Sequence, residues 1–310
     1  MNEKTLDEVL SDFKVSVKNL ISKYFESDIQ PTLYHYTSCE TLISIVTKQE
    51  FWLSNVEFMN DKLEVNYSMR IIQTALAESS VDERSAKIFL KTIKKHKKRA
   101  NETLYVLSLS KDEDSLNLWN NYGKNDGYSI GIDTPKFITK ITERRIGVKT
   151  SQETLLFDNI SVFGNVLYDE ASQVRFFREL FDHYYSFILN TNIFRINELN
   201  TNKIISEMFQ VWDTILKFSY MIKQKEHQIE NEFRFIAFND NHQANFFRVR
   251  NGIVLPYIKI GFEKNELMPI KEICIGPKIN ENIASAGIKY LLKKNYRKTN
   301  ITKSSLKLLF

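Results

Sequence analysis

Apolar residues recur at intervals of three and four positions over the first 25 residues, opposite a charged face. This spacing places them on one side of a helix, so the pattern predicts an amphipathic helix over residues 5–25. The apolar positions are Leu6, Val9, Leu10, Phe13, Val17, Leu20, Ile21 and Tyr24. Pro31 follows and disfavours helical backbone at the residue before it, so a new element is expected to begin there.

Strand-like runs and helical stretches alternate irregularly along the rest of the chain. Runs rich in β-branched and aromatic residues predict strands at 32–37, 51–55, 103–110, 127–133, 159–169, 230–238, 256–262, 272–277 and 301–309. Helical spacing predicts helices at 38–50, 62–80, 82–102, 112–123, 171–222 and 280–295. Short strands between helical segments of unequal length favour an α+β fold: a mixed, mostly antiparallel sheet core with flanking helices.

The predicted organisation is an N-terminal helix over residues 1–30, followed by a single α+β domain over 31–310. The long aromatic helical stretch at about 171–222 is interpreted as an insertion in that domain. The chain contains no internal repeat and no Gly/Ser linker that would mark a further boundary.

Charge and cysteine usage narrow the class of protein only slightly. The formal net charge of +5 permits an acidic partner such as nucleic acid without requiring one. Cys39 and Cys274 have neither metal-like nor disulfide-like spacing, which suits a reducing compartment. The charged N-terminus lacks the apolar core of a signal peptide, and no run is long enough to span a membrane. We therefore expect a cytoplasmic protein without a membrane partner.

His35 lies between two tyrosines in "LYHYTS", and histidine is scarce, with five in 310 residues. Its ring is either a satisfied core group or the first residue of a site. None of the histidines shows HxxxH or HExxH spacing, so no metal site of that kind is expected. Walker-type and GxGxxG phosphate loops are also absent from the sequence.

Two charged motifs each have a functional and a structural interpretation. "KTIKKHKKR" (91–99) has six cations in nine residues, which predicts either a nucleic-acid contact or a solvated helix face. "ENEFRF" (230–235) places Glu230 and Glu232 two apart in a predicted strand, so both carboxylates and Arg234 are expected on one face. The alternative is an edge strand with a wet polar face, in which Arg234 neutralises its neighbours.

Aromatic and polar side chains follow two of the predicted elements. "LWNNYG" (118–123) brings Trp119 and Tyr122 to one side of a short helix, as a wall for a flat ring or as a core anchor. The run after the strand at 51–55 places polar groups at Ser54, Asn55, Asn60, Asp61 and Glu64.

Taken in order, five motifs resemble the bacterial domain-of-unknown-function family numbered 2971. They are "YHYTS", "FWLSN…FMNDKLE", "LSLSKDEDSLNLWNNYGKNDGYSIGID", "KQKEHQIENEFRFI" and "EICIGP". The resemblance spans roughly residues 31–306, with His227 as a departure from the aromatic residue expected there. The family has no settled activity to carry over.

A second resemblance, of layout only, implies an activity. A strand ending in histidine, then a helix and a strand with serine, is similar to the opening of ADP-ribosyltransferases of the His-Tyr-Glu type. A Gly-aromatic-x-x-Gly strand and a late strand with a catalytic glutamate also recur in those enzymes. The resemblance implies NAD as the substrate, no metal, and a macromolecular acceptor such as nucleic acid. A bacterial toxin or phage-defence effector is the role this implies.

The same resemblance assigns roles to residues. His35 would bind the adenosine-side ribose, Thr37 the nicotinamide amide, and an aromatic ring would stack on nicotinamide. Glu232 would stabilise the positive charge that develops as the glycosidic bond breaks, and Glu230 would orient or deprotonate the acceptor. The catalytic residues implied are Glu232, Glu230 and His35. The NAD-binding residues implied are His35, Tyr36, Thr37, Ser54, Trp119, Tyr122, Tyr128 and Arg234.

Two other hypotheses stay open. In the first, the protein is a non-enzymatic nucleic-acid or nucleotide sensor, with the cations of 91–99 and the aromatic residues binding phosphate and base. In the second, it is a magnesium-dependent nuclease that uses Asp61, Glu64, Glu230 and Glu232.

Overall fold

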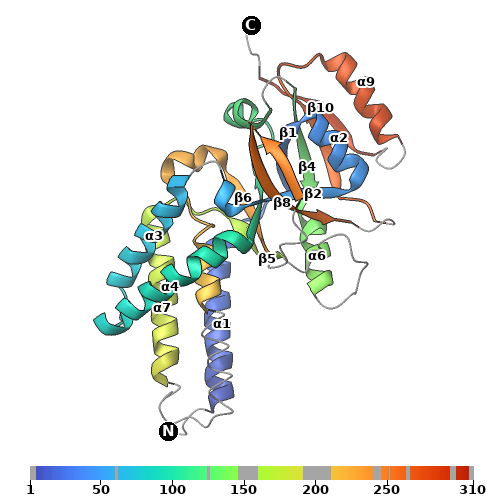
Figure 1. Ribbon diagram of the computed structural model, residues 1–310. Helices are drawn as coiled ribbons and strands as arrows, with labels where there is room; N and C mark the ends of the chain where they lie inside the picture. Colours follow the sequence, from blue (N-terminus) through green and yellow to red (C-terminus); the bar gives the residue numbers. More distant parts are fainter. Residues whose placement is uncertain are drawn as a thin grey trace. The chain divides into compact units, whose positions relative to one another are not determined.

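A computed structural model describes residues 5–59, 62–123, 126–145, 160–190, 211–239, 246–250, 252–262, 266–293 and 298–306. The chain divides into two compact units, which are described separately (Figure 1). Unit 1 comprises residues 1–27, 59–104 and 164–227, and unit 2 comprises residues 28–58, 105–163 and 228–310. The predicted N-terminal helix and the predicted insertion therefore fall in the same unit, which also takes in residues 59–104.

Unit 1 is helical, and its elements are joined by aromatic packing. Its main described helices are α1 (Leu6–Phe25), α3 (Lys62–Ala77), α4 (Glu83–Thr103) and α7 (Glu170–Asn190). The predicted first helix is confirmed, and Thr5 and Glu8 form a capping box at its start. The apolar stripe of α1 packs on α7, where Phe13 stacks on Phe187 at 4.7 Å between ring centroids. This packing explains why the first helix belongs to a helical unit instead of standing alone.

Unit 2 is built on a sheet to which the described residues contribute ten strands. Its strands are β1 (Thr32–Ser38), β2 (Glu50–Asn55), β3 (Leu104–Ser110), β4 (Gly127–Asp133), β5 (Ile160–Asn165), β6 (Glu232–Phe238), β7 (Phe246–Arg250), β8 (Ile253–Gly261), β9 (Ile270–Ile275) and β10 (Asn300–Lys303). The order is β10-β9-β4-β1-β3-β2-β8-β7, and β6 pairs with β3 and β5. The pairs β1–β4, β4–β9, β2–β8 and β7–β8 are antiparallel, whereas β9–β10 is parallel. The predicted α+β class with a mixed, mostly antiparallel sheet is confirmed.

Helices and short helical turns complete unit 2. They are α2 (Cys39–Lys48), η1 (Val56–Phe58), α5 (Leu116–Leu118), a π-helical turn η2 (Trp119–Gly123), α6 (Thr134–Arg145), η5 (Lys225–Glu230, which begins in unit 1) and α9 (Glu281–Leu292). Ser38, the first residue of the predicted helix at 38–50, caps α2 by accepting a hydrogen bond from the Thr41 amide. The predicted strand at 159–169 is confirmed in part by β5, whereas α6 falls in the preceding stretch, where the sequence showed no clear pattern.

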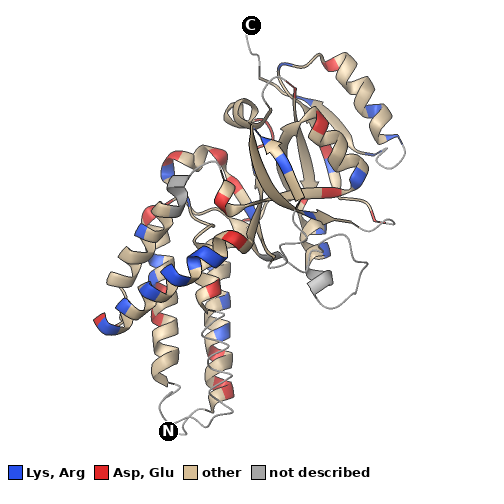
Figure 2. Cartoon of the chain, viewed as in Figure 1, with Lys and Arg blue, Asp and Glu red and all other residues tan. Residues whose placement is uncertain are grey.

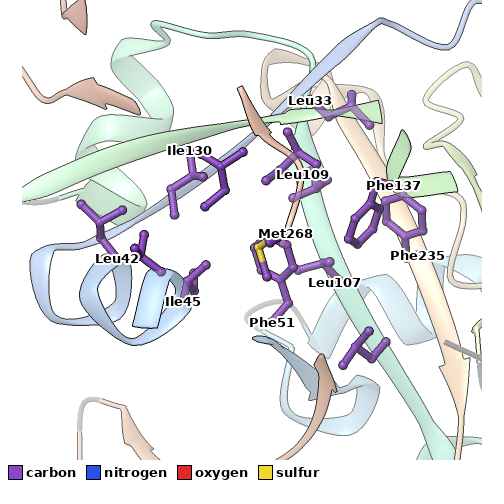
Figure 3. Close-up of a cluster of buried hydrophobic side chains, with 14 of the residues drawn as sticks. Leu33, Leu42, Ile45, Phe51, Leu107, Leu109, Ile130, Phe137, Phe235 and Met268 are labelled. Carbon is purple, nitrogen blue, oxygen red and sulfur yellow. The ribbon is translucent and has the colours of Figure 1, made fainter. Parts of the chain in front are cut away.

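The core of unit 2 lies between the sheet and helices α2, α6 and α9. Alternate residues of the strands point into it, among them Leu33 of β1, Phe51 of β2 and Phe235 of β6 (Figure 3). Phe137 of α6 meets Phe235 edge-on, with 5.1 Å between ring centroids. Because strand side chains alternate, the intervening residues of each strand face away from this core, and the candidate site is built from some of them.

Among the described residues, no helix is both long and apolar enough to cross a membrane.

Candidate functional site

His35 is positioned by β1, which pairs along its whole length with β4. The His35 Nδ1 atom lies 3.4 Å from the Ser108 carbonyl oxygen, and the ring meets Phe51 edge-on with 5.4 Å between centroids. Burial lowers the pKa of His35 to about 4; the interaction of the ring with the Ser108 carbonyl oxygen opposes this shift, and the positive charge of Arg248 adds to it. The imidazole is therefore neutral at pH 7.

Arg248, on β7, reaches Ser54, on β2. Its Nη2 atom donates a hydrogen bond to the Ser54 hydroxyl at 2.6 Å. Burial lowers the pKa of the guanidinium, and neighbouring Arg250 lowers it as well. The Arg248 Nε atom is buried without a hydrogen-bond partner, and no described carboxylate pairs with this side chain. Within the described part of the chain, this half-buried cation is hydrogen-bonded to a hydroxyl and is not paired with an acid.

Strand alternation places Ser54 and Arg248 on one surface. Since Phe51 and Leu53 point into the core, Trp52 and Ser54 point away from it, and the same holds for Tyr257 and Lys259 on β8. Phe246 of β7 is paired with Tyr257 of β8, so Phe246, Arg248 and Arg250 lie on the same side of the sheet as Tyr257. We call this surface the β2–β8–β7 face: Trp52, Ser54, Phe246, Arg248, Arg250, Tyr257 and Lys259.

The β2–β8–β7 face interleaves aromatic rings with cations. Trp52 stacks on Tyr257 with 4.7 Å between ring centroids. The Lys259 ammonium lies 4.1 Å from the centre of the Phe246 ring, and the Arg248 guanidinium lies 5.9 Å from that of Tyr257. Lys259 is also paired with Glu50 at 3.6 Å, so its charge is partly neutralised, unlike that of Arg248.

Tyr122 joins this site through Arg250, whose guanidinium lies 6.0 Å from the Tyr122 ring centre. Tyr122 belongs to the π-helical turn η2, a geometry that is frequent at functional sites. The turn ends at Gly123, which lies against Gly127 so closely that a Cβ on Gly127 would sit 2.2 Å from the Gly123 Cα. Glycine at 127 is thus required for the turn to pack where it does.

The interpretation of "ENEFRF" as one strand with three polar residues on a face is wrong for Glu230. Glu230 ends the 3-10 helix η5, and Asn231 has a φ of 44° before β6 begins at Glu232. Glu232 and Arg234 form a buried ion pair, with Nε–Oε1 at 3.0 Å and side chains 7% and 0% exposed. The alternative of a wet edge strand is also wrong, because β6 has β3 and β5 as neighbours and both its faces are buried.

His35 and Glu232 project from opposite faces of their strands. His35 lies two residues after Leu33 in β1, so its side chain is on the same, core-facing side of the strand. Glu232 precedes the core residue Phe233 in β6, so its side chain is on the side that faces away from this core. The described contacts of His35 are with Ser108 and Phe51.

Tyr36 and Trp119 form a second, smaller cluster. The Tyr36 hydroxyl donates to the Asp112 carbonyl at 2.8 Å and accepts from the Ser115 amide at 2.9 Å. Trp119, 2% exposed, packs edge-on against Tyr36 and donates to Asp114 at 2.7 Å. These contacts are those of the core anchor that was the structural alternative for Trp119.

Thr37 and Tyr128 are paired across β1 and β4, and both are buried. Burial raises the pKa of Tyr128 to about 12, and neighbouring Cys39 adds to the shift. Of the predicted NAD-binding residues, Ser54 and Tyr122 lie against the arginines of β7, whereas His35 lies on the core side of β1 beside Phe51. The structure places Tyr36, Thr37, Trp119, Tyr128 and Arg234 in packed surroundings.

No cluster of three or more His, Cys, Asp or Glu side chains that could hold a metal occurs in the described part of the chain. Asp61 lies outside the described residues, and so does the side chain of Glu64, so the nuclease hypothesis stays untested at those two positions.

Arg248 and Arg250 were not predicted from the sequence. The signal is "FFRVR" (246–250), in which Phe246, Arg248 and Arg250 are two apart and so share one face of a strand. Only the pairing of β7 with β8 and of β8 with β2 brings that face to Ser54.

The fold and this site define an α+β protein with an aromatic, cationic sheet face. The model of a family described as a protein of unknown function (DUF2971) matches residues 118–235, a segment that includes Tyr122 and Glu232. The match supports the family resemblance over that segment and adds nothing for the resemblance to ADP-ribosyltransferases. No curated protein and no solved structure matches the chain.

Proposed function

We propose that unit 2 binds a phosphate-bearing nucleotide on the β2–β8–β7 face. The observation that carries the proposal is Arg248, a half-buried guanidinium that contacts a hydroxyl and has no described carboxylate partner. Withdrawing a cation from water without a counter-ion is costly, and an anionic ligand would offset that cost. A guanidinium also matches the geometry of phosphate oxygens.

The aromatic neighbours favour a nucleotide over a simple anion. Tyr122 is partly exposed beside Arg250, and Trp52, also partly exposed, stacks on Tyr257 beside Arg248. A base has a flat π-face that stacks on such rings, while its phosphates meet the arginines. His35 is not part of this face, because it shares the core-facing side of β1 with Leu33.

NAD carries both groups and is one of the nucleotides this face would take. Transfer of ADP-ribose from NAD stays a prediction, and the geometry gives it less support than binding. Glu232, the carboxylate expected to act on the glycosidic bond, is held by Arg234 in a buried pair. It also alternates with core residues that share the face of His35.

Isothermal titration calorimetry with ADP, NAD and inorganic phosphate tests binding. We expect ADP and NAD to bind, and Arg248→Gln to weaken both by at least about tenfold, which is about 1.4 kcal/mol. Arg175→Gln is the matched control, because Arg175 is an exposed arginine of α7 in unit 1. Failure of every probe to bind, or equal binding by both variants, would refute the nucleotide site.

The enzymatic hypothesis is tested separately by nicotinamide release from labelled NAD, in the presence of bacterial RNA, DNA or lysate. Release that is lost in Glu232→Gln, with folding verified by circular dichroism, would establish the transferase hypothesis. Binding of NAD without release or transfer would leave a nucleotide-binding protein.

A further inference from the structure

Helix α4 carries a row of lysines on the side opposite its packed face. The helix begins after the cap residue Asp82, and Phe89, Ile93, Ala100 and Thr103 are buried in unit 1. Lys91, Lys94, Lys95 and Lys98 are all exposed, and their spacing of three and four residues aligns them along one side of the helix. We call these four residues the α4 lysine row; Figure 2 shows the concentration of cations along this helix.

The α4 lysine row has no acidic partners among the described residues. One turn earlier, the Lys87 ammonium is paired with the Glu83 carboxylate at 2.6 Å. Lys87 is thus a lysine of the same helix whose charge is neutralised, in contrast to the row. Lys97, off the row, is half-buried, and burial lowers its pKa to about 8. The row is therefore a line of exposed cations without a described acidic partner.

We propose that the α4 lysine row binds the phosphate backbone of nucleic acid without reading its sequence. Lys91 and Lys98 are seven residues apart, which is about 10 Å along a helix axis and matches about three consecutive phosphates of one strand. Lysine ammonium groups act as point charges on flexible stems and suit contacts that do not depend on base identity. Arg99 is exposed next to the row and extends it.

An anionic membrane is the competing partner, and the structure disfavours it. A helix that lies in a membrane interface presents a broad apolar face beside its cations. In α4 the apolar residues Phe89 and Ile93 are 4% and 0% exposed, because they are packed inside unit 1. Ile88 is the large apolar residue that α4 exposes, at 55%, and one side chain does not make an insertion face.

The proposal is independent of the nucleotide site, since it concerns a helix of unit 1 and uses none of the same residues. The test is fluorescence anisotropy of a labelled duplex of arbitrary sequence over a series of salt concentrations. Contact with about three phosphates predicts a slope of log K against log salt of about −3. The double variant Lys94→Gln/Lys98→Gln should bring that slope closer to zero by about 2 and weaken binding at low salt by at least about tenfold.

Two controls separate local contacts from net charge. Lys18→Gln/Lys289→Gln removes the same number of charges from exposed lysines elsewhere and should leave binding unchanged. Lys94→Arg/Lys98→Arg keeps both charges and should keep the slope. All these positions are exposed, so the variants are expected to fold.

Three outcomes would overturn the proposal. The first is that the parent protein does not bind the duplex at low salt. The second is that Lys94→Gln/Lys98→Gln and Lys18→Gln/Lys289→Gln lose the same amount of duplex binding. The third is that Lys94→Gln/Lys98→Gln loses more binding to phosphatidylserine vesicles than to the duplex. Arg248→Gln, included in the same series, should lose nucleotide binding and keep duplex binding. The failure of one proposal would thus be distinguished from the failure of the other.

Discussion

Arg248 on β7 donates a hydrogen bond to Ser54 on β2, at 2.6 Å, although β8 lies between the two strands. The contact joins residues 194 apart in sequence and holds the guanidinium over the neighbouring strand. A side chain fixed in this way loses little conformational freedom when a ligand arrives, so its position is prepared before binding. The pairing of these two residues is therefore central to the nucleotide proposal.

Ser54→Ala is expected to weaken ADP binding without unfolding unit 2. The change removes the acceptor of one Arg248 hydrogen bond, so the guanidinium becomes free to move, and affinity should fall about three- to tenfold. Ser54→Thr keeps a hydroxyl and should stay close to the parent protein. Calorimetric titration of the two variants, alongside urea unfolding, measures both properties; an Ala variant that binds as tightly as the Thr variant would mean that Ser54 does not position Arg248.

Stability should fall as the pH drops from 7 to 5 because of His35. Its pKa in the folded protein, about 4, is below the usual value of 6.5, so the unfolded chain binds more protons between these two values. The contribution of the neutral His35 to the free energy of unfolding is fully present above pH 6.5 and is lost as the pH falls toward 4. The loss amounts to about 2 kcal/mol at pH 5. The carboxylates with shifted pKa values, such as Asp114 and Asp133, have lowered ones and titrate below this range.

Urea unfolding of the parent protein and of His35→Gln at pH 7 and pH 5 measures this dependence. The variant has no imidazole at position 35, so its free energy of unfolding should change much less over the same interval. A parent protein that is equally stable at both pH values would show that His35 is not held neutral by its surroundings.

Much of the fold follows from local pattern, because the strands and helices of this chain carry clear periodicity and caps. The first helix, β1, α2 and the "GYSIGID" strand all appear where the sequence predicts them. Division into two units did not follow, because it depends on which apolar faces meet. The stripe of α1 gives no indication in sequence that it packs on α7, about 150 residues later.

The candidate site was only partly predictable for a similar reason. Ser54 and Tyr122 belong to motifs that the sequence already singles out, whereas Arg248 and Arg250 reach the site only through strand pairing. The error at Glu230 has a local cause: Asn231 adopts a left-handed conformation, which ends the 3-10 helix and delays the strand by two residues. Asparagine tolerates that conformation better than most residues. The alternation of polar and apolar residues in "IENEF" is that of a strand, so it gives no indication of the left-handed residue.

Glu232→Gln is expected to destabilise unit 2 by about 3–5 kcal/mol, because it removes the carboxylate charge that is paired with the buried Arg234 guanidinium. The double change Glu232→Leu/Arg234→Met should recover most of that loss, since it removes both charges together. Glu170→Gln breaks an ion pair with Arg70 whose two side chains are each 54% exposed, and it should cost less than about 1 kcal/mol.

Urea unfolding of these three variants separates a structural carboxylate from a catalytic one. A Glu232→Gln protein as stable as the parent would mean that the pair does not hold Glu232, and the transferase hypothesis would gain support. A loss of the expected size, recovered in the double variant, identifies the pair as a structural element of the core.

Tyr184→Phe is expected to leave unit 1 as stable as before or to stabilise it by about 1 kcal/mol. The Tyr184 side chain is fully buried among aromatic rings, including Phe89 and Trp212, and its hydroxyl has no hydrogen-bond partner among the described residues. Removing an unsatisfied buried hydroxyl removes its desolvation cost while the ring keeps its contacts.

Tyr67→Phe is the matched control, because the Tyr67 hydroxyl donates to Gln173 at 2.6 Å and its loss should cost about 1–2 kcal/mol. Thermal and urea unfolding of both variants measure the difference; a Tyr184→Phe protein destabilised as much as Tyr67→Phe would show that the Tyr184 hydroxyl has a partner in the folded protein.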